Sequence, residues 1–174
     1  MTALLAILTL ATAPAHAAIA LDPAPLLGGD LLECVNPDKA QKSCLGIGQY
    51  TRLPDGKILS TDRILVSTNP PVVMRMETIV RFSGNSICSR MTERDLESLA
   101  FSWKGAKIEG DLEGYLRAEM VMRYSNMIDL DLCTTLFGSS SAIKVRFFVE
   151  GKPADDDGLT MIWVRTDEGY TVKP

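Results

Sequence analysis

The chain has 174 residues, a net charge of −4 at pH 7 and 23 % charged residues. This length suits one domain behind a short leader, and the mild acidic balance gives no reason to expect nucleic acid as a partner. The single histidine, His16, lies in the predicted leader. The mature chain is therefore expected to lack Ser–His–Asp and Cys–His catalysis and histidine-based metal sites.

Residues 1–17 have the layout of a signal peptide: an apolar run over 3–11, then Pro14, then small residues at Ala15 and Ala17. The apolar run is shorter than the roughly 20 residues that span a bilayer. An N-terminal core helix is the alternative. No cysteine follows the predicted cut, so we expect no lipid anchor, and no later stretch predicts a transmembrane segment. We expect a periplasmic or extracellular protein, cleaved near Ala17.

Residues 18–33 contain several prolines and glycines and predict an irregular lead-in to a single domain over 34–174. Pro54, Asp55 and Gly56 separate two apolar runs, over 44–53 and 57–66, which predicts a β-hairpin. Apolar and charged residues alternate over 72–82, a pattern typical of a strand. A turn and a short strand at 87–89 follow.

Two helices are predicted next. Over 92–103, Thr92 and Asp95 form a capping pattern ahead of apolar residues at helical spacing. Over 111–128, apolar residues recur every four positions in a segment rich in Leu, Glu, Arg, Ala and Met. Strands are predicted over 129–137, 143–150 and 159–165, with a short edge strand over 169–174. This order predicts an α+β fold, an antiparallel sheet of about six or seven strands with two helices inserted mid-chain. A β-sandwich or a barrel with a helical insertion is the alternative.

Four cysteines in an exported chain predict two disulfides, and the favoured pairs are Cys34–Cys44 and Cys88–Cys133. Two other connectivities remain open at this stage. The spacings do not match the C-x₂₋₄-C pairs of zinc sites or the C-x-x-C of redox couples.

A sequence resemblance covers most of the mature chain. The Cys-x₉-Cys loop, ICS, the helical middle, LCTTLF and the terminal WVRTDEGYTVKP together resemble small secreted bacterial proteins with two cysteine pairs. The resemblance implies export and paired cysteines, and it implies no activity.

Two segments suggest metal ligands. Asp155, Asp156 and Asp157 precede a glycine, and carboxylate-rich loops bind Ca²⁺, although a solvated turn is the simpler interpretation. Met74 and Met76 offer thioethers suited to Cu(I), although methionine also fills irregular cores. We expect no resident cofactor.

Two further groups suggest binding or catalysis. Trp163, Arg165 and Tyr170 are residue types common at binding surfaces. Asp129 and Asp131 share one face if they lie on a strand, and paired carboxylates perform acid–base chemistry when one pKa is raised. Solvent-facing positions on a half-exposed strand explain them as well.

These observations predict a non-catalytic exported domain with a binding or structural role in the bacterial envelope. The partner is an unidentified envelope component or small ligand. The alternatives are a carboxylate-based hydrolase acting on envelope material and methionine-based copper handling.

Overall fold

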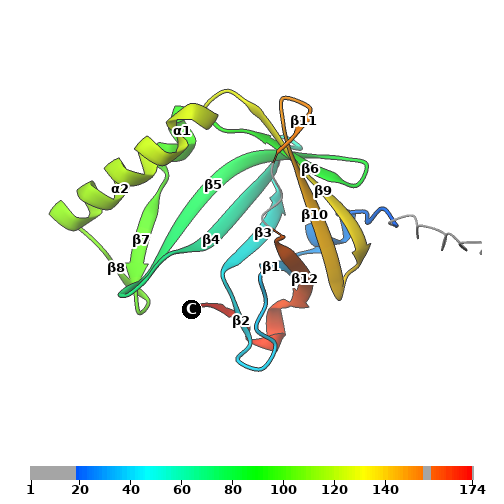
Figure 1. The fold of residues 1–174 in the computed structure, drawn as a ribbon, viewed down its shortest axis with the longest axis horizontal. Coiled ribbons are helices and arrows are strands. Elements are labelled where there is room, and N and C mark those ends of the chain that lie inside the picture. The colour runs from blue at the N-terminus through cyan, green and yellow to red at the C-terminus, as the bar shows by residue number, and fades with distance from the viewer. Residues whose placement is uncertain (1–18, 155–157, 174) are drawn as a thin grey trace, which may run out of the picture.

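Eight antiparallel strands close into a β-barrel in the computed structural model, which describes residues 19–154 and 158–173 (Figure 1). In the order in which they neighbour one another, the barrel strands are β4 (Ile58–Thr68), β3 (Gly46–Arg52), β1 (Leu31–Val35), β12 (Thr160–Arg165), β10 (Ala142–Val149), β9 (Asp131–Ser139), β6 (Ser86–Arg90) and β5 (Pro71–Ser83). Pairing of β5 with β4 completes the ring.

Smaller elements surround the barrel. Three strands extend the sheet, and these are β7 (Ala100–Trp103), β8 (Ala106–Lys107) and β11 (Lys152–Pro153). A separate parallel pair consists of β2 (Ser43–Cys44) and β13 (Thr171–Val172). The helices are α1 (Glu93–Glu97) and α2 (Asp111–Tyr124), with 3₁₀ turns η1 (Ala24–Gly28), η2 (Ser125–Met127) and η3 (Thr166–Glu168). None of the helices in the described ranges has the length and apolar character needed to cross a membrane.

The predicted α+β fold with an open sheet is wrong, because the sheet closes on itself. Closure depends on β1, which lies between β3 and β12 and pairs with both. Part of β1 falls inside the segment predicted to be an irregular lead-in, so the strand that joins the two ends of the sheet was missed. A closed barrel has no free edge, which removes the exposed backbone groups of an open sheet. The barrel with a helical insertion, given as the alternative, is closer to the structure.

The first predicted helix is correct only in its first half. Thr92 caps it as expected, since the Thr92 N–H donates to Asp95 Oδ2 at 2.7 Å and the Thr92 side chain accepts from the Asp95 N–H. The helix ends at Glu97, and 100–103 form β7 instead. Phe101 of β7 is buried opposite Met74 of β5, so pairing with an existing strand overrides the helical spacing. The second predicted helix is confirmed by α2 and η2.

Both predicted disulfides are confirmed. Cys34–Cys44 ties β1 to β2, with the two Cα atoms 5.4 Å apart. Cys88 and Cys133 lie directly opposite each other on β6 and β9, with Cα atoms 4.1 Å apart, so this bridge joins two neighbouring strands. The hairpin around Pro54–Gly56 is confirmed by β3 and β4.

Different elements cover the two ends of the barrel. At one end, η1 places the fully buried Leu26 against Tyr50 and Ile58. Toward the other end, the long strands β4 and β5 continue beyond the ring, and Figure 1 shows α1 and α2 on that side, beside β7. The core under these helices includes Met74, Phe101 and Met120. The barrel interior lies between these two groups.

Candidate functional site: a cavity inside the barrel

A cavity of about 520 Å³ lies within the barrel, and all eight barrel strands contribute residues to its lining. At one end, Tyr124 of α2 and Met127 of η2 also line it. Small-molecule sites in proteins commonly have volumes of about 300–1,000 Å³, and eight-stranded barrels are able to hold one small ligand. The cavity therefore has the size and position of a ligand site.

The wall of the cavity is mostly apolar. Its aliphatic residues, phenylalanines and methionines are Val35, Ile64, Met76, Val80, Ile87, Met91, Met127, Leu132, Val145, Phe147, Phe148, Val149, Ala154, Leu159 and Met161. Methionine is flexible and adapts to irregular shapes, so a wall with four methionines accommodates varied apolar groups.

Two carboxyl groups break this apolar lining, Glu33 on β1 and Asp62 on β4. Gly48 of β3 is the register partner of both, so the three residues form one row across adjacent strands. A Cβ at Gly48 would lie 3.0 Å from Asp62 Oδ1 and 3.2 Å from Glu33 Oε2. The missing side chain at Gly48 therefore lets the two carboxyl groups approach each other. We call Glu33 and Asp62 the carboxyl pair.

Each member of the carboxyl pair accepts one hydrogen bond from a neighbouring hydroxyl. Tyr50 Oη donates to Glu33 Oε2 at 2.6 Å, and Ser60 Oγ donates to Asp62 Oδ2 at 3.0 Å. Three buried side-chain polar atoms in the described part of the chain have no hydrogen-bond partner: Glu33 Oε1, Thr78 Oγ1 and Trp163 Nε1. The strand register places Trp163 opposite Glu33 and Thr78 opposite Ser60, so all three belong to the same region of the barrel.

Burial changes the protonation of the carboxyl pair. The pKa of Glu33 rises from 4.5 to about 7 because burial penalises the charged form; the Tyr50 hydrogen bond partly offsets this, and the Asp62 charge adds to it. The pKa of Asp62 rises from 3.8 to about 6, again through burial, with an opposing contribution from Ser60. Burial and the nearby carboxylates also raise the pKa of Tyr50, which keeps its hydroxyl a donor. Perturbed carboxyl groups in a cavity are typical of functional sites.

The carboxyl pair has no basic partner among the described residues of the cavity. Among the described residues that line it there is no Lys, Arg or His. Buried carboxylates in proteins are normally paired with a cation or a metal. No group of three or more Cys, Asp, Glu or His residues suited to a metal ion occurs in 19–154 or 158–173.

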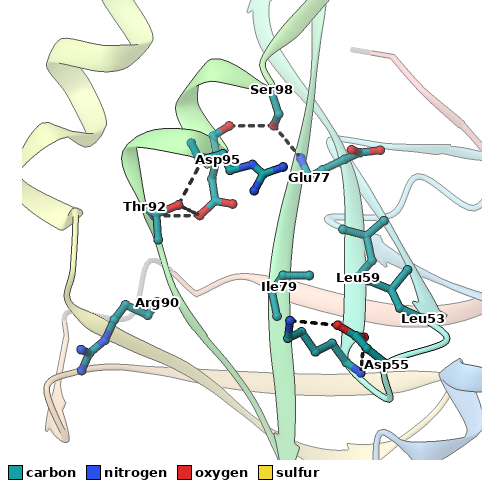
Figure 2. Close-up of a pocket in the computed structure, with 11 residues that line it drawn as sticks. Leu53, Asp55, Leu59, Glu77, Ile79, Arg90, Thr92, Asp95 and Ser98 are labelled. Atoms are coloured by element: carbon teal, nitrogen blue, oxygen red, sulfur yellow. Dashed lines mark hydrogen bonds and ion pairs between the residues drawn. The ribbon is translucent and has the colours of Figure 1, made fainter.

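A second hollow, of about 370 Å³, lies on the outer surface between α1 and strands β4 and β5 (Figure 2). Its polar groups bind one another: Ser98 Oγ donates to the Asp95 carbonyl at 2.7 Å and accepts from the Glu77 N–H at 3.3 Å, while Thr92 and Asp95 form the helix cap. These contacts explain Thr92, Asp95 and Ser98 as structural. The cavity inside the barrel is therefore the stronger candidate.

The structure does not bring the predicted binding residues together. Trp163 is half-buried and packs with the apolar groups of the barrel interior. Arg165 is exposed and its Nε lies 3.1 Å from Asp167 Oδ1. Tyr170 packs against a different cluster, on the other side of the strands, that includes Cys34.

The predicted metal ligands have separate positions. Met74 is fully buried under the helices, and Met76, on the same face of β5, lines the cavity. Asp155, Asp156 and Asp157 lie outside the described residues.

Asp129 and Asp131, on which the hydrolase hypothesis depends, do not share a strand face. Asp129 precedes β9 with a φ of 62°, and Asp131 is in an ion pair with Arg81 at 2.7 Å.

Sequence reasoning missed both members of the carboxyl pair. A signal was present for Asp62, because Ile58, Ser60, Asp62 and Ile64 occupy alternate positions of one strand and therefore share a face. Glu33 gave a weaker signal, as one acid within the short apolar run 31–35.

Comparison of the chain with protein-family models, with curated proteins and with solved structures finds no match.

Proposed function

We propose that the protein is a non-catalytic binding protein that holds a small, mainly apolar molecule inside its barrel. The observation that carries the proposal is the cavity of about 520 Å³, lined by all eight strands and mostly apolar. Burying a ligand there removes apolar surface from water, which favours binding by about 25 cal/mol per Å². The two carboxyl groups that line the cavity, Glu33 and Asp62, supply the few directional contacts that orient such a ligand.

We propose further that the protein works in the periplasm or outside the cell, after removal of the leader near Ala17. Two disulfides support an extracytoplasmic compartment, because thiols stay reduced in the cytosol. Intact-mass measurement on protein isolated from its host tests this: retention of residues 1–17, or four alkylatable thiols, would contradict it.

Titration with N-phenyl-1-naphthylamine, an apolar dye whose fluorescence rises in apolar sites, tests ligand binding. We expect saturable binding of one dye per chain. Ser89→Phe should abolish it, because Ser89 lines the cavity and the larger ring occupies the ligand space. Arg90→Phe is the matched control, since Arg90 is the next residue on β6 and is exposed on the opposite face. Equal loss in both variants, or no saturable binding in the native protein, contradicts the proposal.

Copper handling is a second candidate, supported by the four methionines that line the cavity, Met76, Met91, Met127 and Met161. Thioethers are soft ligands that favour Cu(I) over harder cations. The test is competition for Cu(I) against bicinchoninate, with the native protein and with Met76→Leu and Met91→Leu combined. Leucine keeps the apolar volume and removes the sulfur. Copper binding that the leucine variant retains in full rules out this candidate.

A further inference from the structure

The carboxyl pair lines the cavity, and one of its acceptor atoms has no hydrogen-bond partner among the described residues. Tyr50 and Ser60 each donate to one oxygen of the pair, at 2.6 Å and 3.0 Å. The second oxygen of Glu33, Oε1, has no partner among the described residues, although Glu33 is only 6 % exposed. A buried acceptor without a donor costs about 1–3 kcal/mol, and more when it is charged. A bound molecule with a donor at this position would remove that cost.

The described lining of the cavity also lacks positive charge. Its described lining includes no basic residue, and the arginines next to the site on the barrel strands do not face inward. Arg63 follows Asp62 on β4 and is exposed, as expected for a residue on the opposite face. Arg81 of β5 is 55 % exposed in its side chain and is paired with Asp131. None of the described residues of the cavity supplies a positive charge to the carboxyl pair, and a bound cation would supply one.

We propose that the molecule held in the barrel is an amphipathic amine, with its ammonium group between the carboxyls of Glu33 and Asp62 and its hydrocarbon part against the apolar wall. This inference rests on the proposed binding function. An ammonium group has three N–H donors and no acceptor, which matches the acceptor oxygens of two carboxylates. The absence of a side chain at Gly48 lets the two carboxyl groups lie close enough for one ammonium group to contact both. An alcohol brings no charge, and a fatty acid would add a third negative group.

Proton uptake by the carboxyl pair gives this binding a pH dependence. Among the described residues, the titratable groups that face the site are Glu33 from β1, Tyr50 from β3, Asp62 from β4 and Tyr124 from α2. Both tyrosines have raised pKa values and stay neutral. The carboxyl pKa values of about 7 and about 6 mean that ammonium binding at pH 5 requires release of protons. Affinity for an ammonium therefore rises from pH 5 to pH 8.

Three probes with the same eight-carbon chain test the inference: octylamine, octan-1-ol and octanoate, each displacing N-phenyl-1-naphthylamine from the native protein at pH 5 and pH 8. At pH 8 we expect octylamine to bind about tenfold or more tightly than octan-1-ol, the effect of a charged hydrogen bond. The difference should shrink at pH 5, and octanoate should bind weakest at pH 8.

Variants of the carboxyl pair test whether these two residues cause the preference for octylamine over octan-1-ol. Glu33→Gln and Asp62→Asn should each lower octylamine affinity about tenfold at pH 8 and leave octan-1-ol within about twofold, because only the charged contact is lost. Glu97→Gln, at an exposed position on α1, is the control. If octylamine binds no better than octan-1-ol to native protein that binds the dye, the amine inference is wrong and the proposed binding function stands. If the native protein binds neither the dye nor any probe, both are overturned.

Discussion

Replacing Glu33 with Gln should remove a pH dependence from the stability of the ligand-free protein. The pKa of Glu33 is about 7 in the folded protein against 4.5 for the unfolded reference. Between these pH values the folded protein holds a proton that the unfolded chain releases, so the free energy of unfolding falls as pH rises. The contribution is fully present below pH 4.5 and is lost as pH passes through about 7.

The size of the effect follows from the pKa shift. One pKa unit corresponds to about 1.4 kcal/mol, so the shift of Glu33 corresponds to roughly 3 kcal/mol of stability lost between pH 4.5 and pH 8. Asp62 acts in the same direction, from 3.8 to about 6, and the two groups titrate as a coupled pair. Glutamine keeps the shape and accepts the Tyr50 hydrogen bond, but it does not ionise. At pH 8 the variant should therefore be more stable than the native protein by roughly 3 kcal/mol, and nearly equal at pH 4.5.

Urea unfolding followed by circular dichroism at pH 4.5, 6 and 8 measures this difference. The control is Glu97→Gln, which removes an exposed carboxyl and should keep the native pH dependence. Parallel curves for the native protein and Glu33→Gln across the three pH values would refute the reasoning. They would mean that Glu33 does not hold its proton inside the barrel.

Three further changes test the structure around the cavity. Exchanging both Cys88 and Cys133 for serine should lower the free energy of unfolding by about 4 kcal/mol in urea titrations, since the bridge closes a long loop. Leu26→Ala should cost about 2–5 kcal/mol in the same assay, because Leu26 is fully buried where η1 covers the barrel end. Gly48→Ala should force the carboxyl pair to move, because the new Cβ would lie close to both carboxyl groups. In dye displacement, octylamine binding should weaken about tenfold, which is the scale of one charged hydrogen bond. Gly46→Ala, whose closest contact for a new Cβ is 3.7 Å away, should leave binding unchanged.

The elements that could be predicted from sequence are those determined by residues close to one another along the chain. The hairpin needs only Pro54–Gly56 between two apolar runs, and β5 needs only its own alternation. The cap at Thr92 was predicted from four residues, and α2 from its composition and spacing. The part of the first predicted helix that failed, 100–103, pairs with β5, which no pattern within those residues could reveal.

Barrel closure could not be predicted because its key contacts join distant parts of the chain. Leu31 is the register partner of Arg165, and Glu33 that of Trp163. The five residues of β1 lie after a segment rich in proline and glycine and carry no alternation long enough to show a strand. Without β1, the remaining strands fit an open sheet equally well, which is why the α+β prediction was the natural one and was wrong.

The same missing strand explains why the carboxyl pair escaped notice. An isolated acid in a short segment usually faces solvent, and Glu33 would do so if β1 were irregular. Insertion of β1 between β3 and β12 turns Glu33 inward, opposite Gly48, and brings it to Asp62. The residues of this row, Glu33, Gly48 and Asp62, do not suit their position in the fold. The interior of a closed barrel favours apolar side chains over two carboxyl groups and a glycine. Such conflicts in natural proteins are expected at functional sites, and the conflict at this row is the reason for placing the bound molecule there.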